Sequence, residues 1–351
     1  MNKEIFLEMI AKGRTYKVTD IHLSVDEFPI FRVNDKIYRF EEYEALTKEG
    51  IESLAEEILT FEERERLDEE KEIDISFRDL SGNCRINIFY ERGNLSFAVR
   101  IIRDEIPTIE ELNLSVKVND FFDERQGLII VCGKTSSGKT STISAMLNKY
   151  NNENCYNILT LEDPIEYIHK NNKSIIRQRE IGKDVKSYKE GIKSALRQNV
   201  DVIMIGELRD RESVEMALTA AETGHIVITT LHSNSVIDTV DRLIGMFGEE
   251  KRDFIQRLVA LNLIGVIHQE FTTGIDDEAQ PIKVPICEIM YMNSGIQNLI
   301  KNGKISQISS FIDVSGRKGM LNKQESIKEL YRAKRFTTEQ FEKEIKNLRK
   351  I

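Results

Sequence analysis

The sequence lacks three features that would place it in common classes of protein. No apolar run in its 351 residues approaches the roughly 18–20 residues needed to cross a lipid bilayer. Its four cysteines include no Cys-x-x-Cys pair, which counts against a zinc ribbon and a disulfide framework and fits a reducing cytosol. The N-terminal stretch carries Glu4 and Glu8, so we expect neither a signal peptide nor a transit peptide there.

The sequence also has fewer basic than acidic residues, with 50 Lys and Arg against 59 Asp and Glu. The formal net charge is -9, with 40% hydrophobic and 31% charged residues, a balance that is typical of soluble globular proteins and unlike a protein that coats nucleic acid. Residues 1–124 contain 17 Lys and Arg against 30 Asp and Glu, whereas the rest contains 33 against 29. These acidic and basic parts are either ordinary solvated surfaces or faces that meet between neighbouring subunits of a ring.

The chain is long enough for two domains, and the first, residues 1–102, reads as a small α+β domain. Alternation of apolar and polar residues predicts strands, with Asn34 and Asp35 as a hairpin turn and one charged amphipathic helix over residues 52–67. The predicted strands are 20–25, 30–33, 36–40, 73–77, 85–90 and 96–102.

Residues 103–113 are polar and contain Pro107, so we place an interdomain linker there. From residue 114 to residue 351 the sequence pattern changes, and apolar strands alternate with helical stretches. This pattern predicts an α/β domain with a largely parallel sheet and a ligand site at the carboxyl ends of its strands. We expect a helical, more basic part from about residue 270. The predicted strands are 128–131, 157–161, 202–205 and 226–230.

Residues 133–140 match the phosphate-loop pattern in full, directly after an apolar strand and at the start of a predicted helix. Glycines let backbone N–H groups turn toward phosphates, and the helix N-terminus adds its positive dipole end. A chance match in a Gly/Ser/Thr-rich turn is the alternative, and the strand and helix on either side disfavour it. The predicted ATP-binding residues are Gly133, Lys134, Thr135, Ser136, Ser137, Gly138, Lys139, Thr140 and Ser141.

Two acidic residues, Glu162 and Asp163, follow the predicted strand 157–161 and precede Pro164. Carboxylates at the carboxyl edge of a parallel sheet can hold Mg²⁺ or orient a water molecule beside a phosphate loop. We therefore predict Thr140 and Asp163 as Mg²⁺ ligands and Glu162 as a catalytic residue. The alternative is an acidic turn before a proline with no chemistry.

Two further strands end in residues with catalytic potential. Glu207 follows the strand 202–205, and we predict that it polarises the attacking water; a merely exposed strand-end carboxylate is the alternative. His232 follows the strand 226–230, where an imidazole can contact the terminal phosphate. A single histidine is more often structural than catalytic, and we assign no function to His169 or His268.

These elements, in this order, resemble the secretion and pilus ATPases, whose four linked motifs have counterparts at 133–140, 161–167, 205–210 and 221–233. The resemblance implies a RecA-like phosphate-loop ATPase domain preceded by a small PAS-like domain, and a homo-hexameric ring that hydrolyses ATP with Mg²⁺. It also implies arginines that reach a neighbour's site from the first domain. Arg85 and Arg100 occupy the matching strands, with Arg103 as a weaker candidate; surface ion pairing is the alternative for each.

Within this superfamily the sequence resembles the type IV pilus retraction ATPases. We expect no additional N-terminal domain, no four-cysteine insert follows His232, and residues 288–290 and 296–300 resemble the C-terminal helix motif of that branch. Gln297 and Gly295 depart from the motif, which usually has arginine and alanine there. The resemblance implies pilus disassembly and twitching motility, and a cytoplasmic protein that meets a pilus platform protein at the inner face of the membrane.

Three rival functions fit parts of the same pattern. A pilus assembly or type II secretion ATPase shares the four motifs, although the missing cysteine cluster counts against it. A RecA-like nucleic-acid translocase requires a basic channel with strongly salt-dependent binding, which an acidic chain disfavours. A non-hydrolysing ring subunit is disfavoured by the intact Lys139, Thr140 and Glu207.

Overall fold

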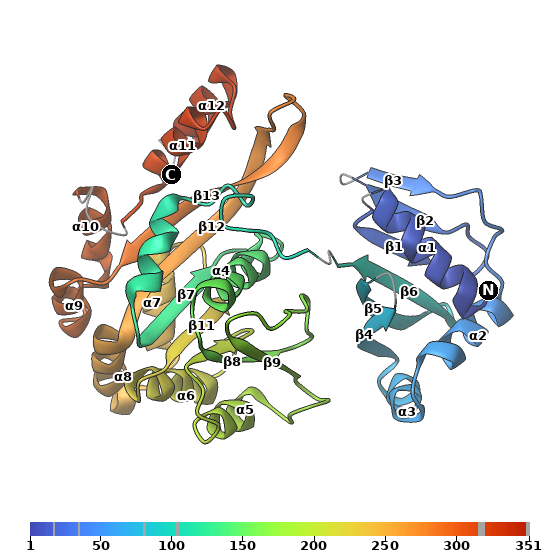
Figure 1. The fold of residues 1–351 in the computed structure, drawn as a ribbon, viewed down its shortest axis with the longest axis horizontal. Helices are drawn as coiled ribbons and strands as arrows, with labels where there is room; N and C mark the ends of the chain where they lie inside the picture. Colours follow the sequence, from blue (N-terminus) through green and yellow to red (C-terminus); the bar gives the residue numbers. More distant parts are fainter. Residues whose placement is uncertain (17, 34–35, 80–81, 103–104, 315–319, 349–351) are drawn as a thin grey trace. The chain divides into compact units, whose positions relative to one another are not determined.

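The computed structural model describes residues 1–16, 18–33, 36–79, 82–102, 105–314 and 320–348. The chain divides into two compact units (Figure 1). The first comprises Met1–Glu105 with Pro164–Ile168, and the second comprises Ile106–Asp163 with His169–Ile351. The predicted turn at Asn34 and Asp35 and the candidate Arg103 lie outside the described residues.

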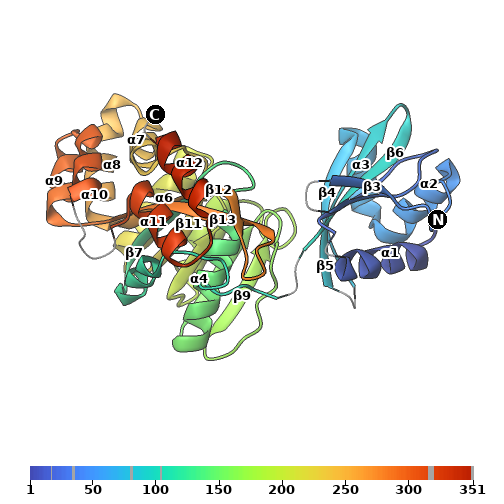
Figure 2. The same cartoon turned by 90° about the horizontal axis from the view of Figure 1, so that it is seen from above.

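In the described part of the first unit, six strands form an antiparallel sheet in the order β3-β2-β1-β6-β5-β4. Its apolar residues, such as Ile21, Ile86 and Val99, share one buried cluster with Phe6 of α1 and Leu54 of α2. Helix α1 runs alongside this sheet (Figure 2). The elements are α1 (Lys3–Thr15), β1 (Asp20–Leu23), β2 (Ile30–Val33), β3 (Lys36–Arg39), α2 (Lys48–Ile58), α3 (Phe61–Glu70), β4 (Glu72–Asp79), β5 (Gly82–Glu91) and β6 (Asn94–Ile101).

The six predicted strands of this unit are confirmed, with ends that agree within three residues. The single predicted helix over residues 52–67 is wrong, because the chain forms α2 and α3 with a break at Leu59 and Thr60. Thr60 is the N-cap of α3: its hydroxyl accepts from the Glu63 N–H, and the Glu63 carboxylate accepts from the Thr60 N–H. This reciprocal capping box starts a new helix where hydrophobic spacing alone predicts a continuous one.

In the described part of the second unit, seven strands form one sheet in the order β13-β12-β7-β11-β10-β8-β9. All neighbouring strands run parallel except the antiparallel pair β12 and β13, which confirms the predicted α/β fold with a largely parallel sheet. The strands are β7 (Gly127–Cys132), β8 (Asn157–Glu162), β9 (Ile175–Glu180), β10 (Val202–Ile205), β11 (Ile226–Leu231), β12 (Leu263–Ile275) and β13 (Pro281–Tyr291).

The helices of this unit lie between and after the strands. They are η1 (Val116–Asp123), α4 (Lys139–Glu153), α5 (Tyr188–Ala195), α6 (Arg211–Glu222), α7 (Val236–Gly245), α8 (Glu249–Asn262), α9 (Ser294–Lys301), η2 (Ile305–Gln307), α10 (Ile308–Val314), α11 (Lys323–Arg332) and α12 (Thr338–Leu348). The expectation of a helical part from about residue 270 is wrong, because β12 continues to Ile275 and β13 ends at Tyr291. Helices follow only from Ser294. None of the helices in the described residues is both long and apolar enough to cross a membrane.

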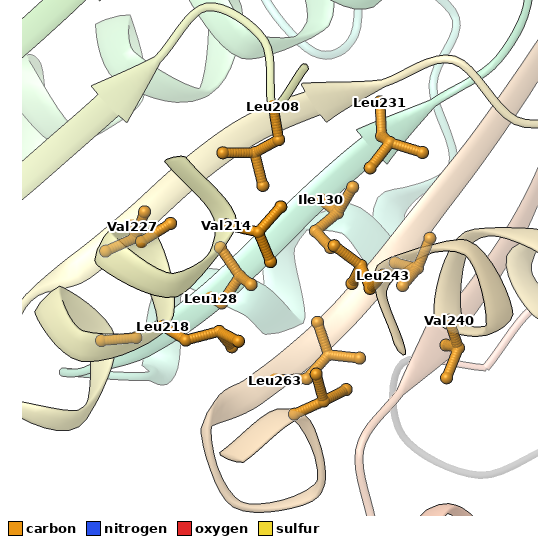
Figure 3. Close-up of a cluster of buried hydrophobic side chains, with 14 of the residues drawn as sticks. Leu128, Ile130, Leu208, Val214, Leu218, Val227, Leu231, Val240, Leu243 and Leu263 are labelled. Atoms are coloured by element: carbon orange, nitrogen blue, oxygen red, sulfur yellow. The ribbon is translucent and has the colours of Figure 1, made fainter. Parts of the chain in front are cut away.

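Both faces of this sheet are buried, which holds the strand ends in place. On one face Ile130 of β7 packs with Leu208, Val214 and Leu231 in a cluster under α6 and α7 (Figure 3). On the other face Ile129 of β7 belongs to a second cluster with residues of α4. Every residue of β7 is buried, so its last residue delivers the following loop to a fixed position.

Candidate functional site

The strand order brings the predicted site residues of the second unit to one edge of the sheet. Strand β11 lies between β7 and β10, and β8 lies on the far side of β10. The phosphate loop follows β7, His232 follows β11, Glu207 follows β10, and Glu162 is the last residue of β8. Because these four strands are parallel, their carboxyl ends all meet at this edge.

The loop after β7 has the backbone geometry that a phosphate cradle needs. Gly133 and Gly138 have φ values of 147° and 86°, and Ser136 also has a positive φ of 62°. A Cβ atom at Gly133 would lie 2.3 Å from the carbonyl oxygen of Gln269, so only glycine fits there. Gly138 is the N-cap of α4 and makes no side-chain hydrogen bond there, so the positive end of the helix dipole adjoins the loop without a capping side chain.

The side chains of this loop fit a bound phosphate. Lys139 is only 8% exposed, and its Nζ donates to the carbonyl oxygens of Gly133 (3.0 Å) and Lys134 (2.9 Å). The buried Ser137 hydroxyl has no hydrogen-bond partner within the described part of the chain. A polyphosphate would fit a site that combines a buried ammonium, an unsatisfied hydroxyl and the N-terminus of a helix.

Gln269 of β12 supports the loop, and the sequence analysis missed it. Its amide is 1% exposed; Nε2 donates to the Ser137 carbonyl at 2.5 Å, and Oε1 accepts from the Thr142 hydroxyl at 2.8 Å. The amide nitrogen therefore binds the loop, and the amide oxygen binds α4. A polar amide within a mostly apolar stretch was the one available signal, but its partners are more than 120 residues away.

Glu207 lies at the centre of a short chain of charged groups. Its Oε2 accepts from Arg209 Nε at 2.9 Å, and its Oε1 lies 3.5 Å from His232 Nε2. Arg209 also approaches Asp163, with 3.6 Å between Nη1 and Oδ2. The sequence analysis did not single out Arg209, although the structure joins it to two predicted site residues.

The environment of these groups sets their charges. Burial and the Lys139 ammonium lower the pKa of His232, against the opposing influence of Glu207, so the imidazole is neutral near pH 7. The hydrogen bond with Glu207 raises the pKa of Arg209, which keeps the guanidinium charged. Arg242 donates from Nη1 to the backbone carbonyl of His232 at 2.6 Å and holds that loop.

The two carboxylates that follow one another at the end of β8 have different surroundings. Glu162 is buried, and its Oε1 accepts from Thr160 Oγ1 (2.6 Å) and Gln178 Nε2 (3.0 Å). Asp163 is open to solvent beside Arg209. Within the described residues no cluster of three His, Cys, Asp or Glu could hold a metal ion. Magnesium usually takes one or two protein oxygens together with phosphates and water, so such a cluster is not required.

Tyr188 of α5 is a further neighbour that the sequence analysis missed. Its hydroxyl lies 2.9 Å from the position of a Cβ at Gly206, so this glycine leaves room for the phenol. Burial and the nearby charge of Asp163 raise the pKa of Tyr188, which keeps the hydroxyl protonated at the edge of the site.

In the first unit the structure brings Arg85 and Arg100 together as direct partners on β5 and β6. Their neighbours Ile86 and Val99 are buried against the helices, so the two arginines lie on the opposite face of the sheet. Arg85 Nη2 lies 3.2 Å from Asp74 Oδ2, and Arg100 Nε lies 3.0 Å from Asp20 Oδ1. Both therefore make the surface ion pairs of the alternative interpretation.

A family model described as "Type II/IV secretion system protein" matches residues 67–350. The chain belongs to this family. The match covers the phosphate loop, Glu162, Glu207 and His232, and it begins within the first unit, at α3.

Individual members of the type II/IV secretion system family are similar over most of the chain. The type IV pilus retractation ATPase PilT of Pseudomonas aeruginosa is 35% identical over 315 residues, which cover 89% of this chain and 90% of that protein. A twitching motility protein of Neisseria gonorrhoeae is 32% identical over 305 residues, covering 87% of this chain and 80% of the relative.

Solved structures agree with this assignment. The crystal structure of the pilus retraction motor PilT with bound ADP superposes with a TM-score of 0.87 at 35% identity, covering 98% of this chain and 97% of that one. The ATPase DotB of Legionella pneumophila has a TM-score of 0.79 at 21% identity and covers 98% and 96%, which supports the fold alone. The chain is thus a nucleotide-binding ATPase of the type II/IV secretion system family.

Proposed function

We propose that this chain is the motor ATPase of type IV pilus retraction. The observation that carries the proposal is the edge of the sheet where the phosphate loop, Glu207 and His232 meet, in a chain similar to PilT over 89% of its length. ATP hydrolysis supplies the energy that moves the pilus fibre during retraction.

Each site residue has a role that follows from its surroundings. Lys139 leaves the loop carbonyls to pair with the β- and γ-phosphates, while Thr140 and Asp163 hold Mg²⁺, which neutralises phosphate charge when bound. Glu207, oriented by Arg209, accepts the proton of the attacking water.

His232 and Glu162 complete this assignment. Neutral His232 contacts the terminal phosphate as a hydrogen-bond donor, which its lowered pKa allows without a second positive charge beside Lys139. Glu162 acts less directly, because Thr160 and Gln178 already occupy one of its oxygens. Its role is to fix the end of β8, and with it Asp163.

The motor works as a homo-hexamer in this proposal, and a neighbouring subunit contributes Arg85 and Arg100 to the site. A nucleotide that binds a closed arrangement of the domains more tightly shifts the population toward it, which converts hydrolysis into movement. The joint is the segment 103–107 of the linker, of which residues 103 and 104 lie outside the described part. The ring is cytoplasmic and meets a pilus platform protein at the inner face of the membrane.

Lys139→Ala should abolish ATP hydrolysis, because the variant removes the one buried ammonium of the phosphate loop. The measurement is phosphate release by the purified, assembled protein. Lys149→Ala is the matched control, since Lys149 lies later on α4 and pairs with Glu153 at the surface. Turnover that persists in Lys139→Ala would contradict the assignment of the loop.

Deletion of the gene in the native cell separates retraction from its main rival. Loss of retraction should give cells with excess surface pili and without surface motility. A pilus assembly ATPase should instead give cells without pili, and a type II secretion ATPase should leave pili unchanged while secretion fails. Electron microscopy of surface pili and a motility assay distinguish the three.

A further inference from the structure

Strand β12 extends beyond the sheet next to the phosphate loop. Its parallel partner β7 ends at Cys132, opposite His268, whereas β12 continues to Ile275 paired only with β13. Figure 1 shows the β12–β13 hairpin extending past the end of β7. The first residues of this extension, Gln269 and Phe271, lie beside the loop that follows β7.

The order of the strands gives the direction in which a nucleotide must lie. Glu207 and His232 follow β10 and β11, which lie on one side of β7, and β12 lies on the other side. If the terminal phosphate points toward Glu207 and His232, as in the proposed function, the ribose and base extend the other way. That direction leads to the projecting part of β12.

Phe271 is the aromatic side chain at this place. Its ring atoms Cζ and Cε2 lie 2.7 and 3.0 Å from the position of a Cβ at Gly138, so the ring packs directly on the last glycine of the loop. The side chain is nevertheless 38% exposed. Its cross-strand partner on the same face of the hairpin is the buried Pro285.

Hydrogen bonds at both ends hold this part of the hairpin firmly enough to position a ring. Gln269, two residues before Phe271 and on the same face, is hydrogen-bonded to the loop and to α4. Further along, Ile275 N–H donates to the Arg335 carbonyl at 2.9 Å, and Thr272 Oγ1 donates to Glu344 at 2.8 Å. The hairpin is thus tied to the phosphate loop at one end and to the C-terminal helices at the other.

We propose that Phe271 forms one wall of the pocket for the nucleotide base and stacks against it. The inference deepens the proposed function, because it names the base-binding part of the same ATP site. An aromatic face stacks on any flat base, so Phe271 contributes affinity more than discrimination between adenine and guanine. It also accounts for an apolar ring that is partly exposed beside a polar loop.

Calorimetry on the full-length protein with Mg²⁺ tests the proposal, using ADP and inorganic triphosphate as the two probes. Phe271→Ala should weaken ADP binding about tenfold, as expected for loss of one base–aromatic stack. Its affinity for inorganic triphosphate, which has no base, should stay unchanged. In hydrolysis assays the same variant should raise the KM for ATP about tenfold and leave kcat within about twofold, while Phe271→Tyr should behave as the wild type.

Two results would overturn the proposal. One is unchanged ADP affinity in Phe271→Ala; the other is an equal loss for ADP and triphosphate, which would mean that the ring only supports the loop. Phe254→Ala, an exposed phenylalanine of α8, is the matched control. If Phe271→Ala does not fold, Phe271→Leu gives the same comparison with the packing on Gly138 partly kept. A wild-type protein that does not hydrolyse ATP would instead contradict the proposed function itself.

Discussion

At the scale of single residues, Glu207 is held from two directions while remaining close to the loop. Arg209 binds one carboxylate oxygen and His232 faces the other, so the side chain has little freedom to turn away. A carboxylate held in this way can orient an attacking water and accept its proton in phosphoryl transfer.

Glu207→Gln should lower ATP turnover at least about a hundredfold while nucleotide binding is kept. Glutamine preserves the shape and can still meet Arg209 and His232, but it cannot accept the proton of the attacking water. Parallel assays of phosphate release and of ADP affinity make this comparison, with Glu215→Gln on α6 as the control because Glu215 pairs with Lys251 at the surface. Hydrolysis at the wild-type rate would show that another group orients the water.

The residues that could be predicted from the sequence are those that follow an apolar strand directly. Lys139 belongs to the phosphate-loop pattern, and Glu207 and His232 lie within two residues of such a strand, so a linear pattern was enough to find them. Gln269 and Arg209 could not be found in this way. Their importance depends on partners brought together by the fold, and a single sequence carries no sign of those contacts.

Buried histidines give the second unit a dependence on pH. His268 is buried on β12 with no partner for Nδ1 within the described residues, and burial lowers its pKa to about 4. The ordinary value is 6.5, so between about pH 6.5 and pH 4 the unfolded chain binds more protons than the folded one. Stability is therefore full above pH 6.5 and is lost as the pH falls toward 4. His169 behaves in the same way.

His268→Gln should flatten this pH dependence. The free energy of unfolding of the wild type should fall by up to about 1.4 kcal/mol per pH unit for each buried histidine, and the variant loses one of them. Urea unfolding at pH 7.5 and pH 5.5, followed by circular dichroism, measures the change in the free energy of unfolding between the two pH values. His22→Gln is the control, because His22 is only partly buried. An undiminished fall in the variant would rule out His268 as a source of the effect.

At the scale of elements, the sequence predicted strands better than boundaries between helices. Strands such as β2 and β10 have the predicted ends, because short apolar runs bounded by polar residues leave little choice. The break between α2 and α3 was missed because Leu54, Ile58 and Phe61 keep a helical spacing across it. The β12–β13 hairpin was missed because its pairing, not its composition, decides its structure.

Thr60→Ala should destabilise the first unit by about 1 kcal/mol, the usual cost of removing a helix N-cap. The variant loses the hydroxyl that accepts from the Glu63 N–H and leaves the start of α3 partly unsatisfied. Urea unfolding measures the loss. Ser53→Ala on α2 is the control, since the Ser53 hydroxyl makes a long 3.5 Å contact with Glu57. An equal loss in both variants would show that Thr60 does not stabilise the unit as a cap.

At the scale of the whole molecule, the proposed hexamer gives the arginines of the first unit a partner outside their own subunit. Arg85 and Arg100 form a basic pair on the face of the sheet that is not covered by helices, beside the carboxylates of Asp74 and Asp20. Exposed ion pairs of this kind contribute little to stability, at most about 1 kcal/mol. In the proposed hexamer, exchange of these carboxylates for a phosphate of a neighbouring subunit would therefore cost little.

Mixing two inactive variants tests whether Arg85 acts on a neighbour. Arg85→Ala subunits keep an intact phosphate loop, and Lys139→Ala subunits keep an intact arginine, so each ring made from one variant should hydrolyse little ATP. In mixed rings, a loop from the first variant meets an arginine from the second, and hydrolysis should recover to a substantial fraction of the wild type. The recovery should depend on the mixing ratio and peak near equal amounts. An arginine that serves its own subunit's site would give no recovery at any ratio, because every subunit would then lack one half of its site.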